Sequence, residues 1–215
     1  MLTRFARHFL LALQFFTRIP VTGRLAQWVG YSPAMLQASA AHFPGVGWVV
    51  GGASALLLKL ALLLLPTQAA STWVAVVLSM VFSVMLTGAF HEDGLADTAD
   101  GLGGGLTRER ALAIMKDSRI GTYGAVALVL ALCTKLCLLV LLLQIGEVWA
   151  IAGLFTAHVV SRLMPLFNTQ AVWGWPAKLL HWVIAACVIG LVGASHSATS
   201  RASSAVFWAA VSLPV

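Results

Sequence analysis

The chain has 215 residues, of which 60% are hydrophobic and only 9% are charged. Soluble domains carry about 25% charged residues, so this composition excludes an ordinary soluble protein and is typical of the membrane class. The formal net charge is +6, but the basic residues are scattered singly, which excludes a nucleic-acid footprint and favours roles as topology signals and phosphate ligands.

The N-terminal segment predicts a short helix at the membrane surface. Arg4 and Arg7 precede an apolar stretch that ends near Pro20 and is too short to cross a membrane. Phe9 and Leu13 fall on one face of that helix, four residues apart. We therefore expect an interfacial N-terminal helix, with its basic side chains at the lipid headgroups.

The rest of the chain contains apolar stretches of about 20 residues, the length that a helix needs to cross a hydrocarbon core. We predict an all-α fold, a polytopic bundle of about five transmembrane helices that forms a single membrane domain over residues 1–215. The tail, residues 195–215, is Ser/Ala-rich at its start and atypical. The expected spans cover residues 44–65, 72–90, 123–143, 148–167 and, less strongly apolar, 178–192.

Some residues inside these spans suggest how the helices pack. Gly47 and Gly51 have the G-x-x-x-G spacing that lets a second helix approach closely. Cys133 and Cys137 lie four apart in one apolar span, which fits neither a disulfide framework nor a zinc site, and we expect them to be buried by packing. Lys59 lies deep in the first span and is expected to snorkel or to face the bundle interior.

Basic residues between the expected spans predict the orientation. The connections after the first and third spans contain no Lys or Arg. Under the positive-inside rule, the N-terminus and residues 91–121 are therefore expected to face the cytoplasm. The eight residues behind this prediction are Arg4, Arg7, Arg18, Arg24, Arg108, Arg110, Lys116 and Arg119.

Residues 91–121 form the segment expected to carry the chemistry, because six of the seven acidic residues of the chain fall within it. Asp93, Asp97 and Asp100 follow at i, i+4 and i+7, which places three carboxylates on one helix face. A divalent cation would relieve their repulsion, and oxygen ligands suit Mg²⁺ or, alternatively, Mn²⁺. A solvated acidic loop is the alternative, but the surrounding alanines and glycines are typical of close packing.

Basic residues follow these acids, at Arg108, Arg110, Lys116 and Arg119. A carboxylate-bound metal beside several guanidinium groups is what a diphosphate substrate requires, although the same cations also serve as topology signals. The glycine run 103–105 fits a phosphate-binding backbone nest and a flexible turn equally well. His91 fits a ligand, an acid/base group and an interfacial residue.

Together these residues resemble a known family. The sequences FHEDGLADTADG, from Phe90, and RERALAIMKDSRIGTYG, from Arg108, closely resemble the motifs of the cobalamin synthase family, the adenosylcobinamide-GDP ribazoletransferases. LALQFFTRIPV, HFPGVGWVVGG and the VSR that ends at Arg162 are similar to further family segments. The resemblance covers about the first 165 residues, and beyond Pro165 we expect the chain to depart from the family.

The resemblance implies a Mg²⁺-dependent transferase of late cobalamin biosynthesis. Adenosylcobinamide-GDP and α-ribazole, or α-ribazole 5′-phosphate, would give adenosylcobalamin, or its phosphate, and GMP. The expected partners are these substrates and the lipid bilayer, with no nucleic acid and with an oligomer left open. Carried over by motif position, the metal ligands are Asp93, Asp97 and Asp100, the substrate-binding residues are Arg108, Arg110, Lys116, Ser118, Arg119 and Arg162, and the catalytic residues are His91, Asp100 and Asp117, with Asp100 or Asp117 as general base.

Three other functions remain as alternatives. A membrane enzyme like the CDP-alcohol phosphatidyltransferases also uses spaced aspartates, but its usual signature has Ala-Arg after Asp-Gly and a longer gap to the next aspartates. A membrane transporter would explain charges inside the spans, such as Lys59 and Arg162, but predicts acidic residues in mid-span rather than at one membrane face. An inactive, truncated remnant of the enzyme is favoured by a C-terminal tail without acidic residues.

Overall fold

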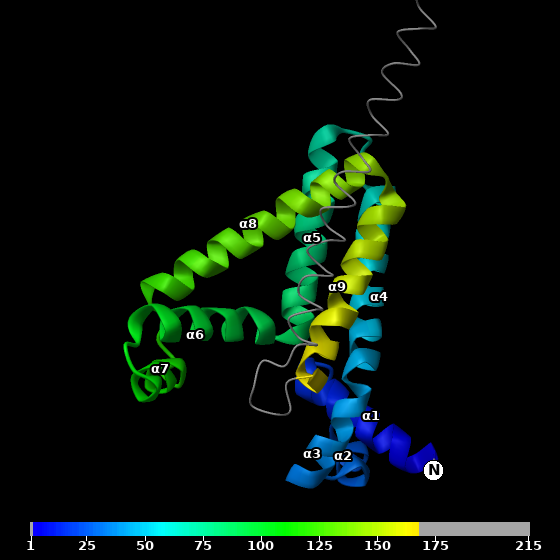
Figure 1. Cartoon of the computed structure of the whole chain (residues 1–215). Coiled ribbons are helices and arrows are strands. Elements are labelled where there is room, and N and C mark those ends of the chain that lie inside the picture. The colour runs from blue at the N-terminus through cyan, green and yellow to red at the C-terminus, as the bar shows by residue number, and fades with distance from the viewer. Residues whose placement is uncertain (1, 168–215) are drawn as a thin grey trace, which may run out of the picture. The chain divides into compact units, whose positions relative to one another are not determined.

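The computed structural model describes residues 2–167, which form helices and no β-strand within that range (Figure 1). The predicted all-α class is confirmed. Residues up to Leu163 belong to one compact unit, and the last described residues, 164–167, lie beyond its boundary. The helices are α1 (Leu2–Phe16), α2 (Gly23–Val29), α3 (Pro33–Ser39), the 3-10 turn η1 (Ala40–His42), α4 (Phe43–Leu64), α5 (Ala69–Thr87), α6 (Phe90–Gly104), α7 (Arg108–Met115), α8 (Thr122–Ile145) and α9 (Glu147–Phe167).

Four helical segments of the described part are long and apolar enough to cross a membrane, so the protein is a multi-pass membrane protein. Each coincides with one of the first four predicted spans, which are thereby confirmed. The predicted span at 178–192 and the tail 195–215 lie outside the described residues. The four segments cover Pro33–Leu64, Ala69–Thr87, Thr122–Ile145 and Glu147–Leu166.

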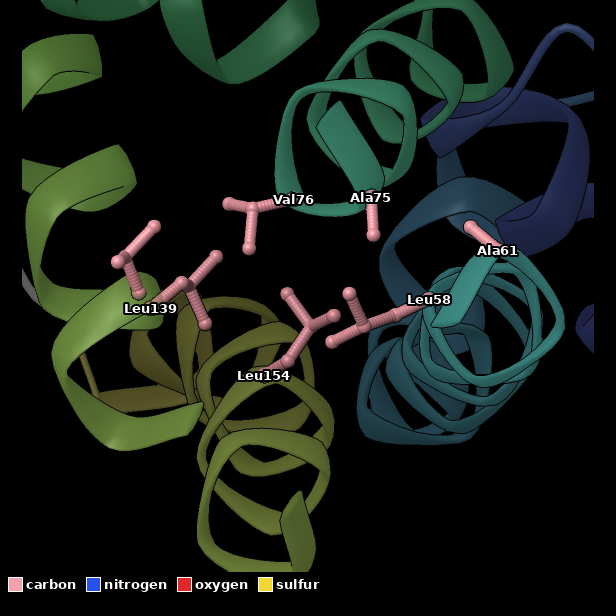
Figure 2. Close-up of a cluster of buried hydrophobic side chains, with 7 residues drawn as sticks. Leu58, Ala61, Ala75, Val76, Leu139 and Leu154 are labelled. Carbon is pink, nitrogen blue, oxygen red and sulfur yellow. The ribbon is translucent and has the colours of Figure 1, made fainter. Parts of the chain in front are cut away.

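The four spanning helices share one apolar core, which Figure 2 shows in close-up. Because lipid tails are as apolar as these side chains, close van der Waals packing rather than escape from water holds such a core together inside a membrane. Its buried members are Leu58 and Ala61 of α4, Ala75 and Val76 of α5, Leu139 and Val140 of α8, and Leu154 of α9.

Helices α4 and α9 approach each other closely at two glycines. A Cβ atom on Gly47 would lie 2.7 Å from the carbonyl oxygen of His158 and 2.7 Å from the Cα of Val159. A Cβ on Gly51 would lie 3.0 Å from the carbonyl oxygen of Phe155. The predicted close approach at these glycines is confirmed, and it holds His158 against the N-terminal half of α4.

The lysine inside the first span has an acidic partner. Lys59 Nζ lies 2.6 Å from Glu147 Oε1, and both side chains are partly exposed. Glu147 is the first residue of α9, where the helix dipole also favours a negative charge. This ion pair joins the C-terminal half of α4 to the start of α9.

The prediction that Cys133 and Cys137 are buried by packing was wrong. Cys133 and Cys137 are exposed on α8 in this structure rather than buried by packing. An apolar residue of a membrane-spanning helix faces lipid as readily as protein, so its presence in an apolar run does not predict burial.

The N-terminal helix packs on the bundle. Leu13 and Phe16 of α1 are buried against Phe43 and Val46 of α4. Arg7 Nε donates a hydrogen bond of 2.9 Å to the carbonyl oxygen of Val29, at the C-terminal end of α2. The predicted helix is confirmed, although it ends at Phe16 rather than near Pro20, and its interfacial position stays a prediction.

A sharp turn separates α5 from α6. Gly88 and Ala89 both adopt left-handed backbone conformations, with φ of 66° and 60°. For a residue with a side chain, such as Ala89, this conformation costs about 1–2 kcal/mol. The Arg18 side chain packs against Gly88, where a Cβ would collide with it, and the Arg18 backbone N–H donates to Leu86 O at 2.7 Å. The turn sends α6 across the direction of α5 (Figure 1).

Candidate active site

Helix α6 carries the acidic motif. Its buried residues are Ala96, Asp100 and Gly101, and it packs along α8. Asp93 is exposed and Asp97 is half-buried. Within the described part of the chain, neither of these two carboxylates forms a hydrogen bond or an ion pair. Asp93 and Asp97 are therefore available to a ligand.

Asp100 anchors α6 to the start of α8. Its carboxylate is only 8% exposed, Oδ2 accepts a hydrogen bond of 2.7 Å from Gly121 N–H, and Oδ1 accepts one of 2.8 Å from Gly124 N–H. Gly121 is the N-cap of α8, so the anion lies where the helix dipole is positive. A Cβ on Gly121 would lie 2.5 Å from Oδ1, so the glycine makes room for the carboxylate. This positioning role was not predicted, and the predicted roles of Asp100 in metal binding and base catalysis stay predictions.

The three aspartates do not converge on one point. Among residues 2–167, no group of three or more His, Cys, Asp or Glu side chains is placed to hold a metal ion. Asp93 and Asp97, one turn apart on α6, form a pair instead. Mg²⁺ is commonly bound through one or two carboxylates together with water and substrate phosphates. The pair fits a metal site that the substrate completes.

The glycine run after the acidic motif serves helix packing. A Cβ on Gly103 would lie 2.5 Å from the ring of Tyr123, at the start of α8. A Cβ on Gly105 would lie 2.7 Å from the Cα of Ala111 in α7. Gly103 also lies inside α6, where the backbone N–H groups are used in the helix. The run therefore lets α7 and α8 pack closely around the end of α6.

Helix α7 presents the predicted phosphate ligands. Its N-cap, Thr107, accepts a hydrogen bond of 3.3 Å from Arg110 N–H, which fixes where the helix begins. All five predicted substrate-binding residues of this region are exposed, and α7 packs against the C-terminal end of α6, where Met115 and Ala111 lie close to Gly101. These residues are Arg108, Arg110, Lys116, Ser118 and Arg119.

Asp117 and Arg119 form an exposed ion pair between α7 and α8. Arg119 Nη2 donates to Asp117 Oδ2 at 2.6 Å, and Arg119 Nε donates to Oδ1 at 3.0 Å. Side-chain hydrogen bonds from Arg119 lower the pKa of Asp117 to about 2. A general base that works at neutral pH has a pKa near 7. The predicted roles of Asp117 as base and of Arg119 as substrate ligand therefore require this pair to open.

A second group of polar side chains lies between α6, α8 and α9. Arg162 is 1% exposed, and its Nη1 donates hydrogen bonds of 3.1 Å to His158 O and to Ser161 Oγ. Within the described residues, its Nε and Nη2 have no hydrogen-bond partner. His158 Nε2 and Glu92 Oε2 are also buried without a partner in the same part of the chain. We call His91, Glu92, Lys135, His158 and Arg162 the buried cationic cluster.

His91 links this cluster to α1. The Phe16 ring stacks on the His91 ring at 5.9 Å between centroids, and Arg162 Cζ lies 5.7 Å from the centroid of the same Phe16 ring. Burial lowers the pKa of His91, the positive charges of Arg162 and Lys135 lower it further, and Glu92 opposes them. The lowered pKa favours the neutral form of the imidazole.

Apart from the anchoring Asp100, the predicted site residues fall in two groups. The first group lies on α6, on α7 and in the loop that follows α7, and the second group, in the buried cationic cluster, contains His91 and Arg162. Sequence reasoning missed Glu92, Lys135 and His158 as site candidates. The signal that could have found Lys135 is its charge inside an apolar span, because ionisable groups at membrane depth are costly and commonly functional.

The fold and these two groups define a multi-pass membrane protein with an acidic and cationic segment typical of phosphoryl-transfer enzymes. The chain belongs to the cobalamin-5-phosphate synthase family, which it matches over residues 8–213. The family match reaches past Pro165, whereas the alignments to individual curated relatives cover 72–79% of the chain.

Curated relatives agree with this family. A protein of Albidiferax ferrireducens named adenosylcobinamide-GDP ribazoletransferase is 59% identical over 169 residues, which cover 79% of this chain and 60% of the relative. A protein of the same name from Polaromonas naphthalenivorans is 59% identical, over 76% of this chain and 63% of that relative. Another, from Leptothrix cholodnii, is 54% identical, over 75% of this chain and 58% of that relative. The chain spans about 60% of the length of the curated relatives it matches. No solved structure matches the chain.

Proposed function

We propose that the chain acts in joining adenosylcobinamide-GDP to α-ribazole or α-ribazole 5′-phosphate, as an adenosylcobinamide-GDP ribazoletransferase. One observation carries the proposal: helix α6 presents two carboxylates that have no partner within residues 2–167, and it packs against α7, whose arginines are exposed, in a chain whose relatives carry that name. Carboxylates that hold a metal, with guanidinium groups beside them, are the groups that a diphosphate substrate requires.

In the proposed reaction, the ribose hydroxyl of α-ribazole attacks the phosphorus that is linked to cobinamide. A new P–O bond forms there, the P–O bond to the GMP phosphate breaks, and GMP leaves with the bonding electron pair. The hydroxyl proton passes to a base. Because little covalent chemistry is left to the protein in such a transfer, positioning and charge stabilisation supply most of the catalysis.

Each group of residues has a proposed part in this transfer. Asp93 and Asp97 would hold Mg²⁺, or Mn²⁺, which when bound neutralises charge on the diphosphate oxygens. The exposed cations of α7 and the following loop would bind phosphate oxygens. His91 is the proposed proton acceptor, because both oxygens of Asp100 already accept hydrogen bonds and Asp117 is held in its ion pair with Arg119.

The test is product formation. Membranes that contain the chain would be incubated with adenosylcobinamide-GDP, α-ribazole and Mg²⁺, and adenosylcobalamin would be separated by liquid chromatography. The relative from Albidiferax ferrireducens serves as the matched control. Product from both proteins supports the proposal. Product from the relative alone would refute it for this chain and favour the inactive remnant.

We further propose that the N-terminus and residues 91–121 face the cytoplasm of the bacterial inner membrane, since eight Lys or Arg residues lie on that side. In a chain with Cys133, Cys137 and Cys187 replaced by Ser, a Thr107→Cys variant should react with a membrane-impermeant maleimide only after permeabilisation. A Gln68→Cys variant, exposed between α4 and α5 at the opposite end, should react in cells whose inner membrane is intact. The reverse pattern would invert the topology.

A further inference from the structure

The buried cationic cluster carries more positive than negative charge. Arg162 and Lys135 bring two formal positive charges, and Glu92 brings one negative charge. Among the described residues, none of the three charged side chains belongs to an ion pair within 4.0 Å. The cluster thus has one positive charge that no side chain of the described range balances.

The unused hydrogen-bond donors of the cluster are also the right kind for an anion. Arg162 is almost completely buried, yet its Nε and Nη2, the two nitrogens on one edge of the guanidinium, have no partner within residues 2–167. That edge is the fork that binds two oxygens of a phosphate at once. Leaving such donors unpaired away from water is costly, so an oxyanion bound there would remove a penalty as well as add bonds.

The surroundings shape this edge into a site. His158 comes from the same helix as Arg162 and is pressed against Gly47 and Gly51, so the backbone of α9 has little freedom to move there. The Phe16 ring covers the guanidinium at 5.7 Å from its Cζ. The Phe16 ring and the close packing of α9 on α4 therefore fix where the guanidinium lies.

We propose that the buried cationic cluster binds a phosphoryl group, with the Nε–Nη2 edge of Arg162 donating to two phosphate oxygens and Lys135 supplying a second positive charge. The identity of that group as one phosphate of a diphosphate substrate rests on the proposed function. Glu92 acts as the counter-charge within the cluster and opposes the incoming anion. This role differs from that of the α7 cations, which lie exposed on another helix.

Opposite effects of two substitutions separate this site from a purely structural charge cluster. In an anion site, Glu92→Gln removes a repelling carboxylate and should tighten binding about tenfold, an effect of the size expected for one nearby charge in a partly buried position. Arg162→Lys keeps the charge but loses the fork and should weaken binding about tenfold. In a structural cluster, Glu92→Gln would lower the melting temperature and leave anion affinity unchanged.

The probe is inorganic pyrophosphate, titrated calorimetrically into the purified full chain in detergent with EDTA present, so that metal binding at Asp93 and Asp97 does not contribute. Glu147→Gln is the matched control, because it removes a partly exposed carboxylate whose partner is Lys59 at the other end of α4. That variant should bind like the wild type.

Each result bears on the proposal. Tighter binding by Glu92→Gln alone supports the site, even if Arg162→Lys fails to fold. The proposal is overturned by absence of pyrophosphate binding, or by equal affinities in the wild type and Glu92→Gln. If product forms but the substitutions do not change pyrophosphate affinity, the proposed function holds and this site is refuted. If the affinities change as expected but no product forms, the site holds and the proposed function is refuted.

Discussion

Replacing Asp100 with Asn tests whether this carboxylate joins α6 to α8. The two backbone N–H groups that it accepts lie at 2.7 and 2.8 Å, and both belong to the first turn of α8. A hydrogen bond to a charged group contributes about 1.5–3 kcal/mol, and an anion at a helix N-terminus adds about 0.3–1 kcal/mol. Asn keeps one acceptor oxygen but turns an N–H₂ group towards the other donor. Asp100→Asn should therefore lower the free energy of unfolding by about 2–4 kcal/mol.

The assay is thermal unfolding in detergent without added metal. A loss of this size corresponds to a fall in melting temperature of roughly 4–16 °C for a chain of this length. Asp97→Asn is the matched control, because the Asp97 carboxylate makes no hydrogen bond or ion pair within residues 2–167 and lies one turn from the like charge of Asp93. Its metal-free melting temperature should not fall.

Activity separates the two aspartates further. Asp97→Asn should reduce Mg²⁺-dependent transfer by about a thousandfold, since losing a metal ligand removes several kcal/mol of transition-state stabilisation. If Asp100→Asn melted like the wild type and lost as much activity as Asp97→Asn, the anchoring role would be refuted. Asp100 would then belong with the metal ligands, as the spacing of the motif first suggested.

Three further predictions follow from other contacts. Gly47→Leu should destabilise the protein by about 1–3 kcal/mol in thermal unfolding, because the larger side chain forces α4 and α9 apart. Gly52→Leu is the control and should not destabilise the protein, because no atom lies within 4 Å of the Cβ position of Gly52. Equal effects of the two substitutions would contradict the close packing at Gly47. The pKa of Asp117 is about 2 in its pair with Arg119, so the carboxylate is ionised throughout the neutral range. Asp117→Asn should therefore leave the shape of the pH–rate profile between about pH 5 and 8 unchanged. Loss of one limb of that profile in the variant would make Asp117 the base. Burial lowers the pKa of His91 from 6.5, so the stability that this residue contributes is complete above pH 6.5 and is lost as the pH falls below that value. His91→Gln should therefore reduce the fall in melting temperature on acidification. If the variant showed the same fall as the wild type, another group would be the one that titrates.

The sequence by itself predicted the helical class, the first four spans and the N-terminal helix. These features depend on local patterns, because the thickness of the bilayer sets the length of an apolar run and the backbone must satisfy its own hydrogen bonds there. The G-x-x-x-G spacing of Gly47 and Gly51 is equally local, and it correctly indicated a close helix contact. The motifs from Phe90 to Gly124 were long enough to indicate the family.

The tertiary structure decided which of these residues meet. Helical spacing grouped Asp100 with Asp93 and Asp97. In the structure, Asp100 accepts hydrogen bonds from residues 21 and 24 positions away in the chain, which helical spacing cannot predict. Lys135 looked like an isolated charge in an apolar span, but it interacts electrostatically with Glu92 of α6 and Arg162 of α9. Periodicity describes which residues share a face of one helix, but the partner of that face depends on how separate helices pack. That packing makes Asp100 an anchor and leaves the guanidinium edge of Arg162 without a partner in the described part of the chain.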